Sequence, residues 1–433
     1  MGWRGWPRRW SVLALAAVCL VAIPGTDAVT PAGGHRHQES FLYVAAVNSG
    51  GTDDPDFIAL VGADPAKKDF GKIIDRVDMP YVGDNLHHFG YSADRRRLLV
   101  PGLHSDRLHV FDVTAPKNPR LLTYSDLGES GYMMPHSVLP RADGTALVTM
   151  LGADTPSTAP GGIIVVDDRT GTFERCFGYC ADRSIPDGGP AHMYDLSHSE
   201  ELNLAVSTTA ARPISFKRGI PVPDHEVAVW DWKAEKVIQK ESLGPGSGAI
   251  AVHWIRSPGA RHGFLITLRG EIWLFEDDDD DGTLRFHLLE AGLAAPGDMV
   301  VSPDQRFLFV SQVAGSSVQV WDVTNKFDPR LVEEEAVHHP LMVRVTGDQQ
   351  RLYVTNSVTA AVDDTLGIDA DYGIYLFSIA EDGTLTSSTP DRRDGFPQPW
   401  VDFMNVQKKF TRGPAGPHMI LFDPGVPPSI DEH

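Results

Sequence analysis

A repeated pattern decides the fold, and its first copy begins at Asn85-Leu86-His87-His88-Phe89-Gly90-Tyr91. A polar turn at residues 92–97 separates this stretch from a short apolar run at residues 98–100. A further apolar run, rich in β-branched and aromatic side chains, follows at residues 107–113. The unit is therefore a histidine, a short apolar strand, a polar turn and another apolar strand.

The same unit recurs along the chain at intervals of roughly 40 to 60 residues. Its strands are short and apolar, and turns such as Ser302-Pro303-Asp304 separate them. Short strands that alternate with such turns at a fixed period are typical of the blades of a β-propeller. The six copies begin near His88, His136, His192, His253, Asp298 and residues 339–342.

The two ends of the chain supply the material for one more blade. Apolar strands are expected at residues 41–45 and 56–61, and another at residues 418–422. Pairing of the last strand with the first would close the ring and remove the free sheet edges that promote aggregation. We therefore expect an all-β protein, a seven-bladed β-propeller closed by pairing of N- and C-terminal strands, as a single domain over residues 41–433.

The first 28 residues have the features of a secretory signal peptide. Arginines precede an apolar run at residues 12–23, no acidic residue accompanies them, and small residues follow. Such a signal is too short to serve as a membrane span. Arg8 and Arg9 resemble a twin-arginine signal, which would make the twin-arginine export machinery a partner. A general secretory signal remains the alternative, and either one predicts a periplasmic or secreted protein after a flexible segment at residues 29–40.

Charge and composition exclude some classes of function. The chain has 433 residues and a formal net charge of −20, and 42% of its residues are hydrophobic. This acidity argues against binding to nucleic acid, whose phosphates it would repel. After the signal peptide, no apolar run is long enough for a transmembrane helix. We expect a soluble protein without nucleic-acid partners.

Two cysteines remain after the signal peptide, Cys176 and Cys180. In an oxidising compartment, a disulfide that closes a small loop is expected. A thiolate pair that binds a metal is the alternative, although no second cysteine pair would complete such a site.

The repeated polar position predicts a metal site. In a propeller the first strand of each blade lines the central channel, so residues at its start converge near the axis. The chain has only 17 histidines, and several fall at this position. Neutral imidazoles gathered in this way bind transition metals, among which copper heads the affinity order. The predicted ligands are His87, His88, His136, His192, His253 and His418.

Asp298 occupies the same position in another copy of the unit. We expect it to act as a catalytic base or to orient a histidine. Whether His338 or His339 joins the site stays open, because the register of that copy is uncertain from the sequence alone. A single histidine of this kind is more often a turn or core residue, so the prediction depends on the whole set.

Three segments resemble the opening of the selenium-binding protein family, which includes the methanethiol oxidases. They are Asp56-Phe57-Ile58-Ala59, Asp78-Met79-Pro80 and Leu86-His87-His88. The resemblance implies a seven-bladed propeller. In exported bacterial members it implies a copper-dependent enzyme that converts methanethiol, oxygen and water to formaldehyde, hydrogen sulfide and hydrogen peroxide. By position, the family's histidines match His87, His88, His136 and His418, whereas His192 and His253 rest on the repeat alone.

The chain also departs from the family pattern. Relatives often carry cysteine shortly after the paired histidines, and Tyr91-Ser92-Ala93-Asp94-Arg95 stands there instead. Selenium binding through such a thiol is therefore doubtful for this chain. The function expected is an exported copper-dependent oxidase of small thiols with oxygen as acceptor. A non-catalytic metal- or selenium-binding propeller, a protein-interaction scaffold and a zinc hydrolase are the alternatives.

Overall fold

The computed structural model describes residues 39–48, 54–154, 158–181, 190–279, 281–368, 371–404 and 414–425. All of them belong to one compact unit, His37–His433. The predicted signal peptide at residues 1–28 lies outside the described residues, as does the predicted flexible segment up to residue 38.

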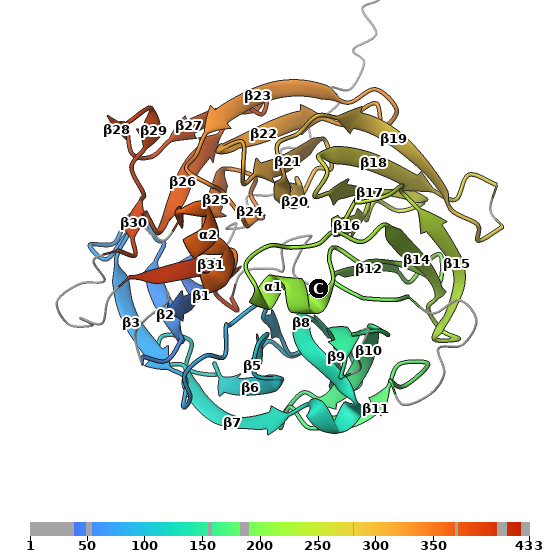
Figure 1. Ribbon diagram of the computed structural model, residues 1–433. Coiled ribbons are helices and arrows are strands. Elements are labelled where there is room, and N and C mark those ends of the chain that lie inside the picture. The colour runs from blue at the N-terminus through green and yellow to red at the C-terminus, as the bar shows by residue number, and fades with distance from the viewer. Residues whose placement is uncertain are drawn as a thin grey trace, which may run out of the picture. The chain divides into compact units, whose positions relative to one another are not determined.

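Seven antiparallel sheets surround a central opening in the described part of the chain (Figure 1). We number them as blades 1 to 7, and each runs from an inner strand at the opening to an outer strand at the rim. From inner to outer strand, blade 1 contains β31 (Ala415–Phe422), β1 (Phe41–Asn48), β2 (Phe57–Gly62) and β3 (Ile73–Asp78); blade 2 contains β4 (Gly90–Tyr91), β5 (Arg97–Gly102), β6 (Arg107–Asp112) and β7 (Arg120–Asp126); blade 3 contains β8 (Tyr132–Pro140), β9 (Thr145–Ala153), β10 (Gly162–Asp167) and β11 (Phe173–Cys176); blade 4 contains β12 (Leu196–Ser199), β13 (Leu204–Thr208), β14 (Glu226–Asp231) and β15 (Lys236–Ser242).

The remaining blades have the same order. Blade 5 contains β16 (Ala249–Trp254), β17 (His262–Thr267), β18 (Glu271–Glu276) and β19 (Arg285–Ala291); blade 6 contains β20 (Pro296–Val301), β21 (Phe307–Gln312), β22 (Ser317–Asp322) and β23 (Arg330–Ala336); blade 7 contains β24 (Val343–Val345), β25 (Arg351–Thr355), β26 (Gly373–Ile379) and β27 (Leu385–Ser387), with β30 (Val401–Asp402) also paired to β26. The prediction of an all-β, seven-bladed propeller is confirmed.

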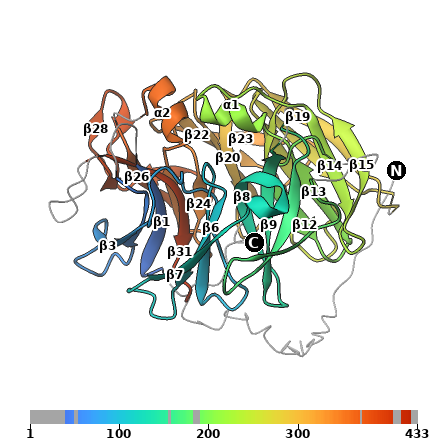
Figure 2. The ribbon, with the colours of Figure 1, turned by 60° about the horizontal axis from the view of Figure 1, so that its bottom comes forward.

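Short elements complete the described chain. The helices α1 (Pro213–Lys217) and α2 (Ala360–Leu366) lie near each other on one face of the ring (Figure 2). A 3₁₀ turn, η1 (Gly128–Ser130), precedes β8, and β28 (Arg392–Arg393) and β29 (Phe396–Pro397) form a small hairpin. None of the helices in the described part of the chain is long and apolar enough to cross a membrane.

Blade 1 closes the ring by joining the two ends of the chain. β31 pairs antiparallel with β1, from Leu42 opposite Phe422 to Asn48 opposite Ala415. The Tyr91 hydroxyl of blade 2 donates a 2.6 Å hydrogen bond to the Phe422 carbonyl. The predicted closure is therefore confirmed, and the closing strand is the inner strand of its blade.

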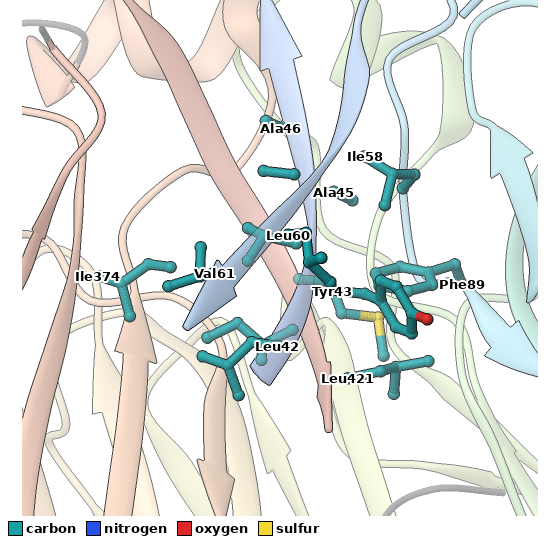
Figure 3. Packing of buried hydrophobic residues seen from close by; sticks show 14 of the residues in the cluster. Leu42, Tyr43, Ala45, Ala46, Ile58, Leu60, Val61, Phe89, Ile374 and Leu421 are labelled. Carbon is teal, nitrogen blue, oxygen red and sulfur yellow. The ribbon is translucent and has the colours of Figure 1, made fainter. Parts of the chain in front are cut away.

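Apolar side chains pack between neighbouring blades and hold this closure. Leu42, Leu60 and Leu421 of blade 1 lie in one buried cluster with Phe89 of blade 2 and Ile374 of blade 7 (Figure 3). Inner strands such as β31 and β16 are buried along their length, whereas outer strands such as β7 and β15 alternate between more and less exposed residues. This alternation has the period of two that a strand with one packed face requires.

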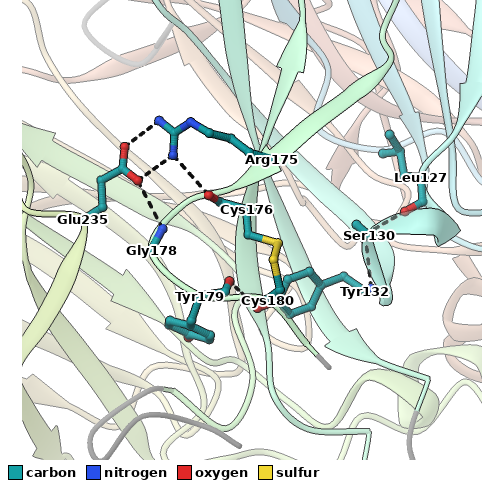
Figure 4. Close-up of a disulfide and its surroundings, with 9 residues drawn as sticks. All are labelled: Leu127, Ser130, Tyr132, Arg175, Cys176, Gly178, Tyr179, Cys180 and Glu235. Atoms are coloured by element: carbon teal, nitrogen blue, oxygen red, sulfur yellow. Dashed lines mark hydrogen bonds and ion pairs between the residues drawn. A yellow bond between two sulfur atoms is a disulfide. The ribbon is translucent and has the colours of Figure 1, made fainter. Parts of the chain in front are cut away.

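Cys176 and Cys180 form a disulfide at the end of β11 (Figure 4). The loop that it closes is bound to blade 4 by Arg175, whose guanidinium donates two hydrogen bonds to Glu235, at 2.6 and 2.7 Å. Glu235 also accepts a 3.2 Å bond from the Gly178 N–H. The predicted disulfide is confirmed, so these sulfurs are not free as metal ligands in this structure.

Replacing Ile420 in β31 by alanine tests the importance of the closure. Ile420 is 1% exposed and pairs with Val44 of β1. We expect Ile420→Ala to lower the free energy of unfolding by about 2–5 kcal/mol, because it leaves a cavity in the closing blade. Urea unfolding measures the loss. Ile238→Ala on the outer strand β15, where the side chain is 49% exposed, should change it by less than about 0.5 kcal/mol. Equal losses of unfolding free energy in Ile420→Ala and Ile238→Ala would contradict the proposed role of β31 in closing the ring.

Candidate metal centre

Four of the predicted histidines meet where the inner strands of three neighbouring blades come together. His418 lies in β31 of blade 1, His87 and His88 directly precede β4 of blade 2, and His136 lies in β8 of blade 3. We call these four residues the histidine cluster. His87, His136 and His418 are buried, and His88 is half-buried.

Among the four imidazole rings, those of His87 and His88 each contact the other three. Ring centroids lie 3.9 Å apart for His87 and His418 and 4.7 Å apart for His87 and His136. His88 and His136 are separated by 4.1 Å, and His87 stacks on His88 at 5.0 Å with 8° between the planes. One ligand nitrogen from each of His87, His88 and His136 lies within 4.8 Å of the others, so this group can hold a metal ion.

The paired histidines both reach the cluster because the strand has not begun at their position. β4 starts at Gly90, and Asn85 has a left-handed backbone with φ of +55°. The His87 N–H donates to the Pro101 carbonyl at 3.0 Å. Within a strand, adjacent side chains would point to opposite faces, whereas this irregular segment allows both rings to lie on one side.

Neighbouring groups fix the orientation of two of the rings. His418 Nδ1 lies 2.7 Å from the Ser357 carbonyl, which can only accept, so Nδ1 carries the proton. His136 Nδ1 lies 2.9 Å from the Ser137 hydroxyl. With Nδ1 engaged in this way, Nε2 of each ring is the nitrogen that remains for a ligand.

Three ring nitrogens in the cluster lack a partner within the described residues. They are Nδ1 of His87 and Nε2 of His136 and His418, and all are buried. A buried polar atom without a hydrogen bond costs about 1–3 kcal/mol, so several such atoms at one place indicate a ligand-binding site. Imidazole nitrogens without thiolates suit copper or zinc, and the residues present therefore fit a transition metal.

Burial lowers the pKa of every histidine in the cluster. It is the leading cause for His87, His88 and His136, and their mutual proximity lowers each pKa further. Burial lowers the pKa of His418 to about 4. The rings are therefore neutral at pH 7, and their lone pairs are available to a metal without the loss of a proton.

A cavity lies beside the cluster on the propeller axis, with a volume of about 50 Å³. A cavity needs about 10–15 Å³ to hold one water, so this one admits a small ligand. Every blade contributes to its wall, which contains both polar and apolar side chains. The polar wall residues are His88, Tyr91, Ser137, Tyr194, Asp195, His253, Asp298 and Arg344.

Two further predicted residues line this cavity without joining the cluster. Burial lowers the pKa of His253 to about 3, with the charge of Arg344 adding to the effect. Asp298 accepts hydrogen bonds from Arg344 at 2.7 Å and from the Val343 N–H at 3.0 Å. Burial raises the pKa of Asp298, and Arg344 opposes that rise.

The other candidate histidines have partners elsewhere. His192 Nδ1 lies 2.7 Å from an Asp224 carboxylate oxygen, and no ring contact joins His192 to the cluster among the described residues. His339 Nδ1 lies 2.8 Å from the Val313 carbonyl, and His338 Nδ1 lies 3.4 Å from Asp371. The structure therefore gathers four of the six predicted ligands.

Ser137, Asp195 and Arg344 are site residues that the sequence analysis did not identify. Each lies in or beside an inner strand, next to a position that the repeat did identify. Asp195 ends the stretch His192-Met193-Tyr194-Asp195, and Arg344 is the charged residue in Leu341-Met342-Val343-Arg344-Val345. For Ser137 and Arg344, a polar residue inside an inner strand was the available signal; Asp195 directly precedes its strand.

The depressed pKa of His418 predicts acid sensitivity of the metal-free protein. The unfolded chain binds a proton at this residue near pH 6.5 and the folded protein only near pH 4, so acidification between these values favours unfolding. We expect His418→Gln to flatten the dependence of unfolding free energy on pH by about 1.4 kcal/mol per pH unit between pH 6 and 5. Urea unfolding of both proteins at pH 7.5, 6 and 5 measures the slopes. Parallel slopes would contradict the prediction.

Comparison with known proteins gives a consistent result. Residues 24–429 match the family described as 56kDa selenium binding protein (SBP56). A mouse (Mus musculus) protein named methanethiol oxidase is 27% identical over 339 residues, which cover 68% of each chain. Selenium-binding protein 2 of Arabidopsis thaliana is 27% identical over 396 residues, which cover 75% of this chain and 80% of that one.

Solved structures show the same fold. The X-ray structure of a hypothetical selenium-binding protein from Sulfolobus tokodaii superimposes with a TM-score of 0.76 at 23% identity, over 90% of this chain and 95% of that one. The periplasmic gluconolactonase of Pseudomonas aeruginosa matches less well, with a TM-score of 0.58 at 16% identity, over 89% of this chain and all of that one. Both likenesses concern the fold alone.

Proposed function

The chain belongs to the 56 kDa selenium-binding protein family, and from this premise we propose that it is an exported, copper-dependent oxidase of small thiols. The proposed reaction converts methanethiol, oxygen and water to formaldehyde, hydrogen sulfide and hydrogen peroxide. Relatives named methanethiol oxidase support the reaction class, at 25% to 27% identity.

One observation carries the proposal: the buried ring nitrogens of the histidine cluster without partners in the described chain. His87, His88, His136 and His418 are the residues that would hold the ion. When bound, copper would supply one-electron chemistry and a positive charge that lowers the pKa of a thiol ligand. The uncharged, nitrogen-only donor set favours copper over the hard cations, which prefer oxygen.

The chain's own residues define what can enter the site. The Ser357 carbonyl and the Ser137 hydroxyl orient His418 and His136, so neither ring must reorganise when a ligand arrives. Apolar side chains on the cavity wall, Met342 and Leu421 among them, can pack against an alkyl group. The small volume favours a thiol with few heavy atoms and excludes large substrates.

Export is the part of the proposal that rests on sequence alone. The signal-like residues 1–28 and the arginine pair Arg8 and Arg9 support a periplasmic or secreted location. The disulfide between Cys176 and Cys180 is consistent with an oxidising compartment.

Removal of one ligand tests the metal site and the reaction together. We expect His88→Ala to bind copper at least tenfold more weakly than the unaltered protein, because it removes a ring of the cluster. Elemental analysis and electron paramagnetic resonance after copper supplementation measure the metal. Formation of hydrogen sulfide and hydrogen peroxide from methanethiol measures turnover, and both products should be lost.

His287→Ala is the matched control, since His287 lies on the outer strand β19 and contacts Glu276 rather than the cluster. It should retain metal and activity. Copper without turnover in the unaltered protein would favour a non-catalytic binding propeller. Full metal content in His88→Ala would contradict the copper site and favour an interaction scaffold.

A further inference from the structure

Two buried carboxyl groups, Asp195 and Asp298, line the cavity and have different partners. Asp298 accepts a hydrogen bond from the Arg344 guanidinium at 2.7 Å, and the two form a buried ion pair. Asp195 has no such ion pair among the described residues. Its oxygens accept from the Ser137 hydroxyl and from the Val252 N–H, each at 3.3 Å.

Ser137 connects Asp195 to the histidine cluster. Its hydroxyl lies 2.9 Å from His136 Nδ1 and 3.5 Å from His88 Nδ1. The hydroxyl has one proton and two lone pairs, so it can donate to Asp195 while it accepts from a ring. The Asp195 carboxyl is therefore one residue away from the rings at which a thiol sulfur would lie.

The surroundings of Asp195 allow it to exchange a proton near neutral pH. Burial is the main cause that raises its pKa, to about 7, and the Asp298 carboxylate acts in the same direction, while two backbone N–H groups and the Ser137 hydroxyl oppose the rise. The neighbouring Tyr194 hydroxyl stays protonated, because burial raises its pKa beyond the physiological range.

The remaining groups around the cavity cannot take this role. His253 is neutral and resists protonation, since its pKa is lowered to about 3. Burial raises the pKa of Asp298, but its protonation would leave the buried Arg344 guanidinium without a counter-charge. His88 and His136 also resist protonation, because burial lowers their pKa values.

We propose that Asp195, rather than Asp298, accepts the proton of the thiol substrate in this cavity. The thiol S–H bond breaks and an O–H bond forms on the carboxylate, which leaves a thiolate beside His88 and a neutral Asp195. No electrons are transferred in this step. The assignment rests on the proposed function, since it requires a thiol in the cavity, and it replaces Asp298 as the predicted base.

The test compares Asp195→Asn with the unaltered protein, because asparagine preserves the shape but accepts no proton. The copper-loaded proteins are mixed with methanethiol under nitrogen, and the sulfur-to-copper absorption band reports thiolate formation. In the unaltered protein the rate should fall about tenfold per pH unit below pH 7, where the carboxylate is lost. Asp195→Asn should be at least tenfold slower at pH 8 and lack this pH dependence, with equal copper content.

A second measurement uses the metal-free protein. Infrared difference spectra between pH 5 and 9 should contain the carbonyl band of a protonated carboxyl that disappears near pH 7, and Asp195→Asn should lack that band. Asp363 is also buried, and its pKa is likewise raised to about 7. The band that disappears in Asp363→Asn therefore belongs to Asp363, not to Asp195. Should Asp195→Asn fail to fold, Asp195→Ser serves for both measurements.

Asp168→Asn is the matched control for thiolate formation. Asp168 is a buried carboxyl that faces Arg97 and lies outside the cavity wall. It should keep the rate and the pH dependence of the unaltered protein. An unchanged rate and pH profile in Asp195→Asn would overturn the role of Asp195 alone, whereas an unaltered protein that binds no copper or forms no thiolate would overturn the proposed function itself.

Discussion

The antiparallel pairing of β31 with β1 is the constraint on which the rest of the structure depends. It joins the ends of the chain, and its inner strand carries His418 into the centre of the ring. The six other blades fold from consecutive segments, whereas blade 1 requires strands from both ends. Formation of the histidine cluster therefore requires ring closure, and a chain that has not closed lacks one of its four rings. Binding of a metal ion by the cluster would therefore be coupled to folding through this single strand.

Much of the fold was predictable because the same unit recurs and each copy is locally consistent. The strand pattern, the seven blades and the closure followed from apolar runs and turns. The site was less predictable because a repeat fixes only an approximate position. His136 and His253 occupy comparable inner strands, β8 and β16, but the His136 ring contacts His88, whereas His253 lines the cavity. His192 precedes its strand and pairs with Asp224 instead. Side-chain direction at a strand entrance depends on loop geometry, and the repeat contains no information about it.

The charges around the cavity complement a bound cation. Neutral imidazoles alone would leave a divalent ion in a buried place without a counter-charge, which is unfavourable. Asp195 and Asp298 face the same cavity, while Arg344 compensates only one negative charge. The wall thus has one negative charge in excess when Asp195 is ionised and none when it is protonated. Transfer of the thiol proton to Asp195 would therefore move one negative charge from the carboxylate to the sulfur, so the total charge in the cavity stays constant.

Two buried carboxylates fix the segment that carries the paired histidines: Asp56, just before β2, and Asp84, within the segment itself. Asp56, before β2, accepts hydrogen bonds from the Leu86 N–H at 3.1 Å and the Asn48 N–H at 2.8 Å. Asp84 accepts a 2.9 Å bond from Arg107 of β6 and lies 3.4 Å from His109 Nε2. Residues 84–88 are thus fixed although they form no strand of their own. Burial raises the pKa of Asp56 to about 6, so the folded protein binds a proton at this carboxyl more tightly than the unfolded chain does. Mild acid therefore neutralises Asp56 without destabilising the fold through it, and the acid sensitivity of the site comes from buried rings such as His418, whose pKa is lowered.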